Sequence, residues 1–214
     1  MVQRFLDAYL QIADLVLIAD GGSDDYTKAI ASSYDRVQIR DFKEKQFGTD
    51  NPTIWGNPED KHINFLIDWA QSFHPDWIIM DDCDSIPSRP LLRTARKALL
   101  ESEALVAKVR RWYMWGWDEH FPDMAKPGLG VWAWRSNTLR AEAPHARHFS
   151  FVPDPDDLPS IEFDTPSILL HNSWPNKIDS WIEKQRFYEA FGFPQHYPPS
   201  SCGPLARIPT WAKE

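Results

Sequence analysis

Along the first two-thirds of the chain, stretches with apolar residues at helical spacing alternate with short apolar runs typical of buried strands. The clearest helical pattern covers residues 58–73, where Ile63, Leu66, Ile67 and Ala70 form one apolar stripe. We expect helices over 2–12, 24–34, 58–73, 88–101 and 175–191, and strands over 14–19, 36–39, 76–80, 104–113, 130–135 and 167–171. This order predicts an α/β fold, a three-layer domain with a mostly parallel central sheet.

The segments between these elements are expected to be loops. Residues 41–58 are polar and contain Gly and Pro, and residues 142–166 are rich in Pro, Asp and His, which predicts a long loop. The last residues, 193–214, are again rich in proline. We therefore predict one domain over residues 1–192, followed by a Pro-rich C-terminal tail over 193–214.

Composition and charge exclude some classes of function. The net charge of −8 and the pI near 5.3 argue against a surface that coats nucleic acid, although a nucleotide could still bind as a small ligand. No apolar run approaches the roughly 20 residues of a membrane-spanning helix. The two cysteines, Cys83 and Cys202, lack the spacing of a metal knuckle or a disulfide framework. A reduced, cytoplasmic location is the expectation.

Two of the predicted strands end in acidic residues. Asp82 and Asp84 follow the apolar run 76–80, and in extended backbone residues i and i+2 point the same way. Two adjacent carboxylates suit Mg²⁺ or Mn²⁺, which could also bind diphosphate oxygens. A solvated acidic turn is the alternative interpretation. Asp81 is expected to point to the other side of the strand or to cap the next segment.

The other strand end is Asp20, followed by Gly21 and Gly22 and then by a predicted helix. Glycines permit positive φ and close backbone approach, and free N–H groups at a helix N-terminus bind anions. A tight structural turn is the alternative here. His171 ends a third apolar run and could be a metal ligand or a structural histidine.

Together these segments resemble the family 2 glycosyltransferases with the GT-A fold. The matching stretches are Asp20-Gly21-Gly22-Ser23-Asp24-Asp25-Tyr26-Thr27, Asn64-Phe65-Leu66-Ile67, and Trp77-Ile78-Ile79-Met80-Asp81-Asp82-Cys83-Asp84. The resemblance is good over residues 2–100, thinner over 100–190 and absent from the tail. It differs in that family members begin with a strand of the type VSVIIPxYNE, whereas this chain begins at the following helix; this strand is therefore expected to be missing.

The resemblance implies a role for each matching residue. Asp20, with Gly21 and Gly22, would bind the nucleotide. In the D-x-D pair, Asp84 would bind the metal directly, and Asp82 would contact the ribose or a metal-bound water. His171 resembles the metal- or phosphate-contacting histidine of many GT-A enzymes.

The resemblance also implies a reaction: inverting transfer from a UDP-, GDP- or dTDP-sugar to a glycan or other hydroxyl acceptor, with Mn²⁺ or Mg²⁺ as cofactor. The catalytic base would be an acid in the loop after the D-x-D strand. Asp118 or Glu119 is the expected base, with Asp123 and Asp164 as further candidates.

Two further possibilities remain open on the sequence. The chain could be a non-catalytic GT-A-like module that binds a nucleotide or a partner. A nucleotidyltransferase would share the metal-diphosphate chemistry, but we find no G-x-G-T-R-type loop. Five tryptophans could form a stacking platform for an acceptor sugar or belong to the core: Trp112, Trp115, Trp117, Trp132 and Trp134.

Overall fold

The computed structural model describes residues 1–42, 59–116, 119–120, 129–145 and 148–172, together with residues 179, 182 and 206–207. The helices are α1 (Val2–Tyr9), α2 (Thr27–Ala31), α3 (Glu59–Gln71), α4 (Arg89–Glu101) and the 3₁₀ turn η1 (Pro155–Asp157). The strands are β1 (Val16–Asp20), β2 (Val37–Asp41), β3 (Trp77–Ile79), β4 (Ser85–Pro87), β5 (Val106–Trp115), β6 (Glu119–His120), β7 (Gly130–Arg135), β8 (Arg140–His145), β9 (His148–Val152), β10 (Ser160–His171) and β11 (Ala206–Arg207).

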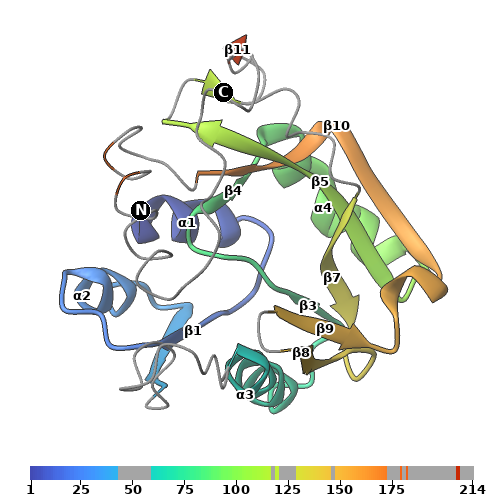
Figure 1. The fold of residues 1–214 in the computed structure, drawn as a ribbon, viewed down its shortest axis with the longest axis horizontal. Helices are drawn as coiled ribbons and strands as arrows, with labels where there is room; N and C mark the ends of the chain where they lie inside the picture. The colour runs from blue at the N-terminus through green and yellow to red at the C-terminus, as the bar shows by residue number, and fades with distance from the viewer. Residues whose placement is uncertain are drawn as a thin grey trace.

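The predicted α/β class is confirmed, but the main sheet is mixed rather than mostly parallel. Its strands lie in the order β11-β6-β5-β10-β4, and β7 pairs with both β5 and β3 (Figure 1). Within this sheet β5 and β10 run parallel, whereas β4, β6, β7 and β11 pair antiparallel to their neighbours. The parallel pair β1–β2 forms a separate small sheet. Short connections such as the one from β5 to β6 permit only antiparallel pairing, because a parallel crossover needs a dozen or more residues.

Helices pack on both sides of the strands and form two hydrophobic cores. The first core contains Phe5 and Leu6 of α1, with Leu99 of α4. The second core contains Ile63 and Ile67 of α3. Successive residues of a strand point to opposite faces, and Ala107 and Val106 of β5 belong to the first and second core respectively. In Figure 1, α1 lies above the strands β1 and β3, and α3 lies below them.

The prediction of a long loop over residues 142–166 is wrong. This part of the chain forms the hairpin β8–β9, the turn η1 and the first half of β10. The strand signal is the alternation of exposed and covered residues, such as exposed Glu162, buried Phe163 and exposed Asp164. Proline, aspartate and histidine obscured this alternation in the sequence.

The remaining elements agree with the sequence to different degrees. The predicted strand 130–135 has the observed bounds, and α1, α3 and α4 lie inside the helices predicted over 2–12, 58–73 and 88–101. Helix α2 is shorter than the prediction over 24–34, and strand β4 was not predicted. The predicted helix 175–191 and the tail 193–214 lie almost wholly outside the described residues.

Candidate functional site

The pairing of β4 with β10 builds the candidate site. The two strands run antiparallel, with Ser85 opposite His171. At the start of β4, the backbone N–H of Ser85 donates to the carbonyl oxygen of Asp82 (2.9 Å) and closes a tight turn. The backbone N–H of Asn172 donates to the carbonyl oxygen of Asp84 (2.7 Å). These bonds hold the acidic segment against the end of β10, so residues far apart in the sequence meet.

Three predicted metal ligands come together there. Asp82, Asp84 and His171 each offer one ligand atom, and these atoms all lie within 4.8 Å of one another. Nδ1 of His171 lies 3.2 Å from Oδ1 of Asp84 and 2.9 Å from the Ser85 hydroxyl oxygen. Asp82 is exposed, while the side chains of Asp84 and His171 are only 23% and 12% exposed.

This donor set fits a small divalent cation. Metal–oxygen bonds of about 2.1 Å at right angles place neighbouring ligand atoms about 3.0 Å apart, close to the separation of Asp84 from His171. Two carboxylates and an imidazole are ligands that Mn²⁺ accepts, and the carboxylates also suit Mg²⁺. The residue types can therefore hold a metal, through Nε2 of His171 or after Nδ1 gives up its contact with Ser85.

Neighbouring side chains orient the histidine and leave a polar group beside it. The ring of Tyr113 meets the His171 ring edge-on, with 5.3 Å between the centroids. Asn172 is fully buried, and neither polar atom of its side-chain amide has a hydrogen-bond partner within the described part of the chain. A buried amide without partners is costly, and only the backbone of Asn172 is tied to the acidic segment, through its N–H to Asp84.

Asp81 points away from Asp82 and Asp84, as the alternation of a strand predicts. Its side chain has no exposed surface. It accepts hydrogen bonds from the hydroxyl of Tyr9 (2.5 Å) and from Arg111 (3.1 Å), and the indole N–H of Trp132 donates to Tyr9 (3.3 Å). Sequence reasoning missed Tyr9 and Arg111, and no local motif marks them, because both come from other elements.

Burial sets the protonation of this internal network. Desolvation raises the pKa of Asp81, although the positive charge of Arg111 and the hydrogen bond from Tyr9 oppose this. Desolvation and the neighbouring charge of Asp81 raise the pKa of Tyr9 well above its usual value. Asp81 thus fixes the start of the acidic segment to α1 and β5.

Cys83 lies between the carboxylates. Desolvation and the charges of Asp82, Asp84 and Asp81 raise the pKa of its thiol to about 11. The thiol therefore stays protonated at neutral pH, and it is a poor nucleophile and a poor metal ligand in this state.

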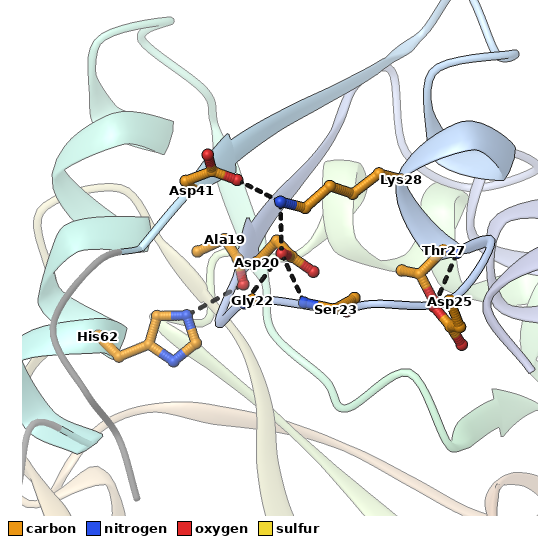
Figure 2. A network of polar contacts seen from close by, with 9 residues as sticks. All are labelled: Ala19, Asp20, Gly22, Ser23, Asp25, Thr27, Lys28, Asp41 and His62. Carbon is orange, nitrogen blue, oxygen red and sulfur yellow. Dashed lines mark hydrogen bonds and ion pairs between the residues drawn. The ribbon is translucent and has the colours of Figure 1, made fainter.

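The second acidic strand end, Asp20, lies in a polar network of its own (Figure 2). Its buried carboxylate, 4% exposed as a residue, accepts the backbone N–H groups of Gly22 (2.9 Å) and Ser23 (3.0 Å). Lys28 lies 3.2 Å from the same oxygen and 2.7 Å from Asp41 at the end of β2. Nearby, a ring nitrogen of His62 contacts the carbonyl oxygen of Ala19 at 3.2 Å.

The contacts of Asp20 stabilise its ionised form. Burial alone would raise the pKa of Asp20, but the hydrogen bonds from Ser23, Gly22 and Lys28 outweigh it and lower the pKa below the usual value. Gly22 has φ +111°, which explains the glycine at this position of the turn. The carboxylate is thus already bonded within its own loop, and a nucleotide would meet the exposed backbone around Gly21 and Gly22.

Of the predicted catalytic bases, the structure describes Asp164 and the backbone of Glu119. Asp118 and Asp123 lie outside the described residues, and of Glu119 only the backbone is described, in β6 beside the end of β5. Asp164 forms an ion pair with Arg110 (2.5 Å), which lowers its pKa to about 2. A carboxyl group of such low pKa is a weak base near neutral pH, so Asp164 is a poor candidate.

Two of these five tryptophans belong to the hydrophobic cores. Trp132 and Trp134 are 0% and 1% exposed and belong to the hydrophobic cores, so these two cannot form an acceptor platform. Trp112 is partly buried beside Met114 and Leu170. The structure does not describe the side chains of Trp115 and Trp117.

Searches of the sequence against protein-family models and against curated proteins gave no match. Among the helices of the described residues, none is long and apolar enough to cross a membrane.

Proposed function

We propose that this chain is a metal-dependent glycosyltransferase of GT-A type, which moves a sugar from a nucleotide-diphosphate sugar to an acceptor hydroxyl with inversion. The observation that carries the proposal is the convergence of Asp82, Asp84 and His171 within 4.8 Å. The motif around Asp20 supports it, because Asp20 also ends a strand that points into a glycine turn.

In this proposal each group has a defined task. Asp84 and His171 would hold Mn²⁺ or Mg²⁺, and Asp82 would contact the metal or the ribose. The bound metal would neutralise charge on the diphosphate leaving group. Tyr113 and Ser85 keep the His171 ring in place. The turn at Gly21 and Gly22 would approach the nucleotide through its backbone.

A base is also required to take the proton of the acceptor hydroxyl. We assign this role to Asp118 or Glu119. The backbone of Glu119 pairs with Trp115 at the end of β5, and Tyr113 in the same strand pairs with His171. The hairpin from β5 to β6 therefore starts at the end of the sheet where His171 lies, which is where a base for this reaction is needed.

The first experiment measures binding. The melting temperature is recorded with UDP, GDP or dTDP, each with and without Mn²⁺, for the wild type, Asp84→Asn and the control Asp35→Asn, whose exposed carboxylate lies outside the site. We expect one nucleotide to raise the wild-type and control melting temperatures only when metal is present, and to leave Asp84→Asn unchanged. Equal shifts in Asp84→Asn, or no shift with any nucleotide at millimolar concentration, would contradict the proposal.

Binding and turnover must then be separated. The alternative function is a non-catalytic module that binds a nucleotide or a partner, and the internal bonding of the Asp20 carboxylate favours it, because that group is occupied by its own loop. Release of the nucleoside diphosphate from a bound nucleotide sugar, with an acceptor present, supports the transferase. Metal-dependent binding without any release supports the alternative.

A further inference from the structure

Ser85 links the candidate metal ligand His171 to the buried carboxylate of Asp81. Ser85 and His171 stand directly opposite each other in the antiparallel pair β4–β10, so their side chains lie on the same face of the sheet. The hydroxyl oxygen of Ser85 lies 2.9 Å from Nδ1 of His171, and Ser85 is 0% exposed. A hydroxyl this deeply buried takes its hydrogen-bond partners from the protein.

The position of the Ser85 proton decides which partner donates to which. A serine hydroxyl has one proton to donate and two lone pairs that accept. Desolvation raises the pKa of Asp81, and the Ser85 hydroxyl is one of the hydrogen-bond donors that oppose this. When Ser85 donates its proton to Asp81, its oxygen can only accept from the ring of His171. The ring proton must then sit on Nδ1.

The surroundings of Asp81 show that its carboxylate acts as an acceptor. It accepts from the hydroxyl of Tyr9 (2.5 Å), from Arg111 (3.1 Å) and from the backbone N–H of Asp82 (3.0 Å). The positive charge of Arg111 also balances the negative charge of the carboxylate. Because these neighbours are all donors, Ser85 meets a fixed, negatively charged acceptor on the side away from His171.

Asp84 favours the same position of the ring proton. Its Oδ1 lies 3.2 Å from Nδ1 of His171. A negative oxygen at this distance repels a nitrogen lone pair and attracts an N–H group. A neutral imidazole carries one N–H, so a proton on Nδ1 leaves the lone pair on Nε2. A metal ion binds the nitrogen that carries the lone pair.

We propose that Asp81, acting through Ser85, holds His171 in the tautomer with its proton on Nδ1, so that Nε2 is the atom offered to the metal. This inference rests on the metal site of the proposed function. Metal-binding histidines commonly donate their second N–H to a carboxylate or a carbonyl, which fixes the ring and raises its basicity. Here Ser85 stands between the ring and the carboxylate. Ser85 and Asp81 are thus positioning residues for the ligand.

The first measurement reads the tautomer in the protein without metal. Nitrogen NMR of the 7 histidines at about pH 8, above the usual histidine pKa near 6.5, separates N–H from lone-pair nitrogens. The variant His171→Gln assigns the signals. We expect the proton of His171 on Nδ1 in the wild type, and a mixture of both tautomers in Ser85→Ala and in Asp81→Asn.

Ser88→Ala is the matched control. Ser88 is also 0% exposed, and its hydroxyl bonds to the backbone of Pro166 and Ile168. Its removal should leave the His171 signals unchanged, although it also takes a buried hydroxyl from the protein. A proton on Nε2 in the wild type, or an unchanged tautomer in both Ser85→Ala and Asp81→Asn, would overturn the proposal. The wild-type spectrum decides the first point even where a variant does not fold.

The second measurement is Mn²⁺ affinity, followed by the electron paramagnetic resonance signal of free Mn²⁺. We expect Ser85→Ala to bind Mn²⁺ about tenfold more weakly than the wild type, and Ser88→Ala to bind it equally well. Equal affinities of the two variants would count against Ser85 as a positioning residue. A wild type that shows the Nδ1 proton but binds no Mn²⁺ would support the tautomer and contradict the metal site of the proposed function.

Discussion

The hydroxyl of Tyr9 donates a hydrogen bond of 2.5 Å to Oδ2 of Asp81, across 72 positions of the chain. This bond anchors the acidic segment to α1 and separates the structural role of Asp81 from the exposed position of Asp82. Removing the hydroxyl by Tyr9→Phe leaves a buried carboxylate oxygen without its donor. We expect the free energy of unfolding to fall by about 1–3 kcal/mol, measured by urea denaturation at neutral pH. Tyr26→Phe is the control: Tyr26 is 81% exposed, and its change should stay within about 0.5 kcal/mol.

The raised pKa of Tyr9 predicts that the folded protein loses stability at alkaline pH. Its pKa is raised in the folded state, so its contribution to stability is complete below about pH 10, the pKa of an unfolded tyrosine. That contribution is lost as the pH rises from there through the folded pKa. Urea denaturation at increasing alkaline pH should show a steeper loss of stability for the wild type than for Tyr9→Phe. Parallel curves for the two proteins would show that Tyr9 does not titrate differently in the folded state.

Truncating Asp81 should lower the stability of the protein, whereas truncating its neighbour Asp82 should hardly change it. Asp81→Ala removes the partner of both Tyr9 and Arg111, and we expect a loss of about 1–3 kcal/mol in unfolding free energy. Asp82→Ala truncates an exposed side chain and should change stability by less than about 0.5 kcal/mol. It should, however, weaken any stabilisation by Mn²⁺. The assignment fails if Asp82→Ala is the more destabilising of the two in the absence of metal.

Asp20 gives a prediction at acid pH. Its pKa is lowered in the folded state, so its contribution to stability is present above the unfolded pKa near 4 and is lost as the pH falls through the folded pKa. Asp20→Ala removes the acceptor of Gly22 and Ser23, and it should cost about 1–2 kcal/mol at neutral pH. The difference from the wild type should shrink steadily between about pH 5 and pH 2, as followed by urea denaturation. A difference that does not change over this range would argue against an ionised Asp20 as the source.

The substitution Gly22→Ala would strain the backbone without causing steric overlap. Among the described residues, chain neighbours aside, a Cβ at this position would meet no atom within 4 Å, so the cost of a substitution comes from its φ of +111°. We expect Gly22→Ala to destabilise the protein by about 1–2 kcal/mol. Gly130 is the matched control, because within the described part of the chain a Cβ there also meets no atom within 4 Å beyond its chain neighbours, and its φ lies outside the left-handed region. Thermal denaturation of both variants should show a clear loss only for Gly22→Ala.

The periodicity of apolar residues was enough to locate most elements. Helix α3 follows the stripe of Ile63 and Ile67, and β7 has the bounds that its apolar run predicts. The strand ends at Asp20 and before Asp82 were also readable, since an apolar run followed by acids or glycines marks where a strand stops. For Asp81 the sequence left two positions open, the other side of the strand or a cap of the next segment. In the structure its side chain lies on the other side, and it also accepts the backbone N–H of Asp82 (3.0 Å).

The sequence did not reveal which elements pair with these strands. Those pairings bring the residues of the candidate site together. His171 meets Asp84 because β4 pairs antiparallel with β10, and no pattern in the sequence indicates β4. Likewise, Tyr9 and Arg111 find Asp81 through the packing of α1 and β5 around it.

The sequence by itself therefore determined which residues lie on apolar faces, where helices α1, α3 and α4 and strand β7 lie, and which acids follow the strands. Only the tertiary structure decided that the main sheet is mixed, that Trp132 and Trp134 are buried, and that Asp82, Asp84 and His171 form one group. The physical reason is that local periodicity reports which side of an element avoids water. It does not report which distant element covers that side, because this depends on packing and backbone pairing summed over the whole chain.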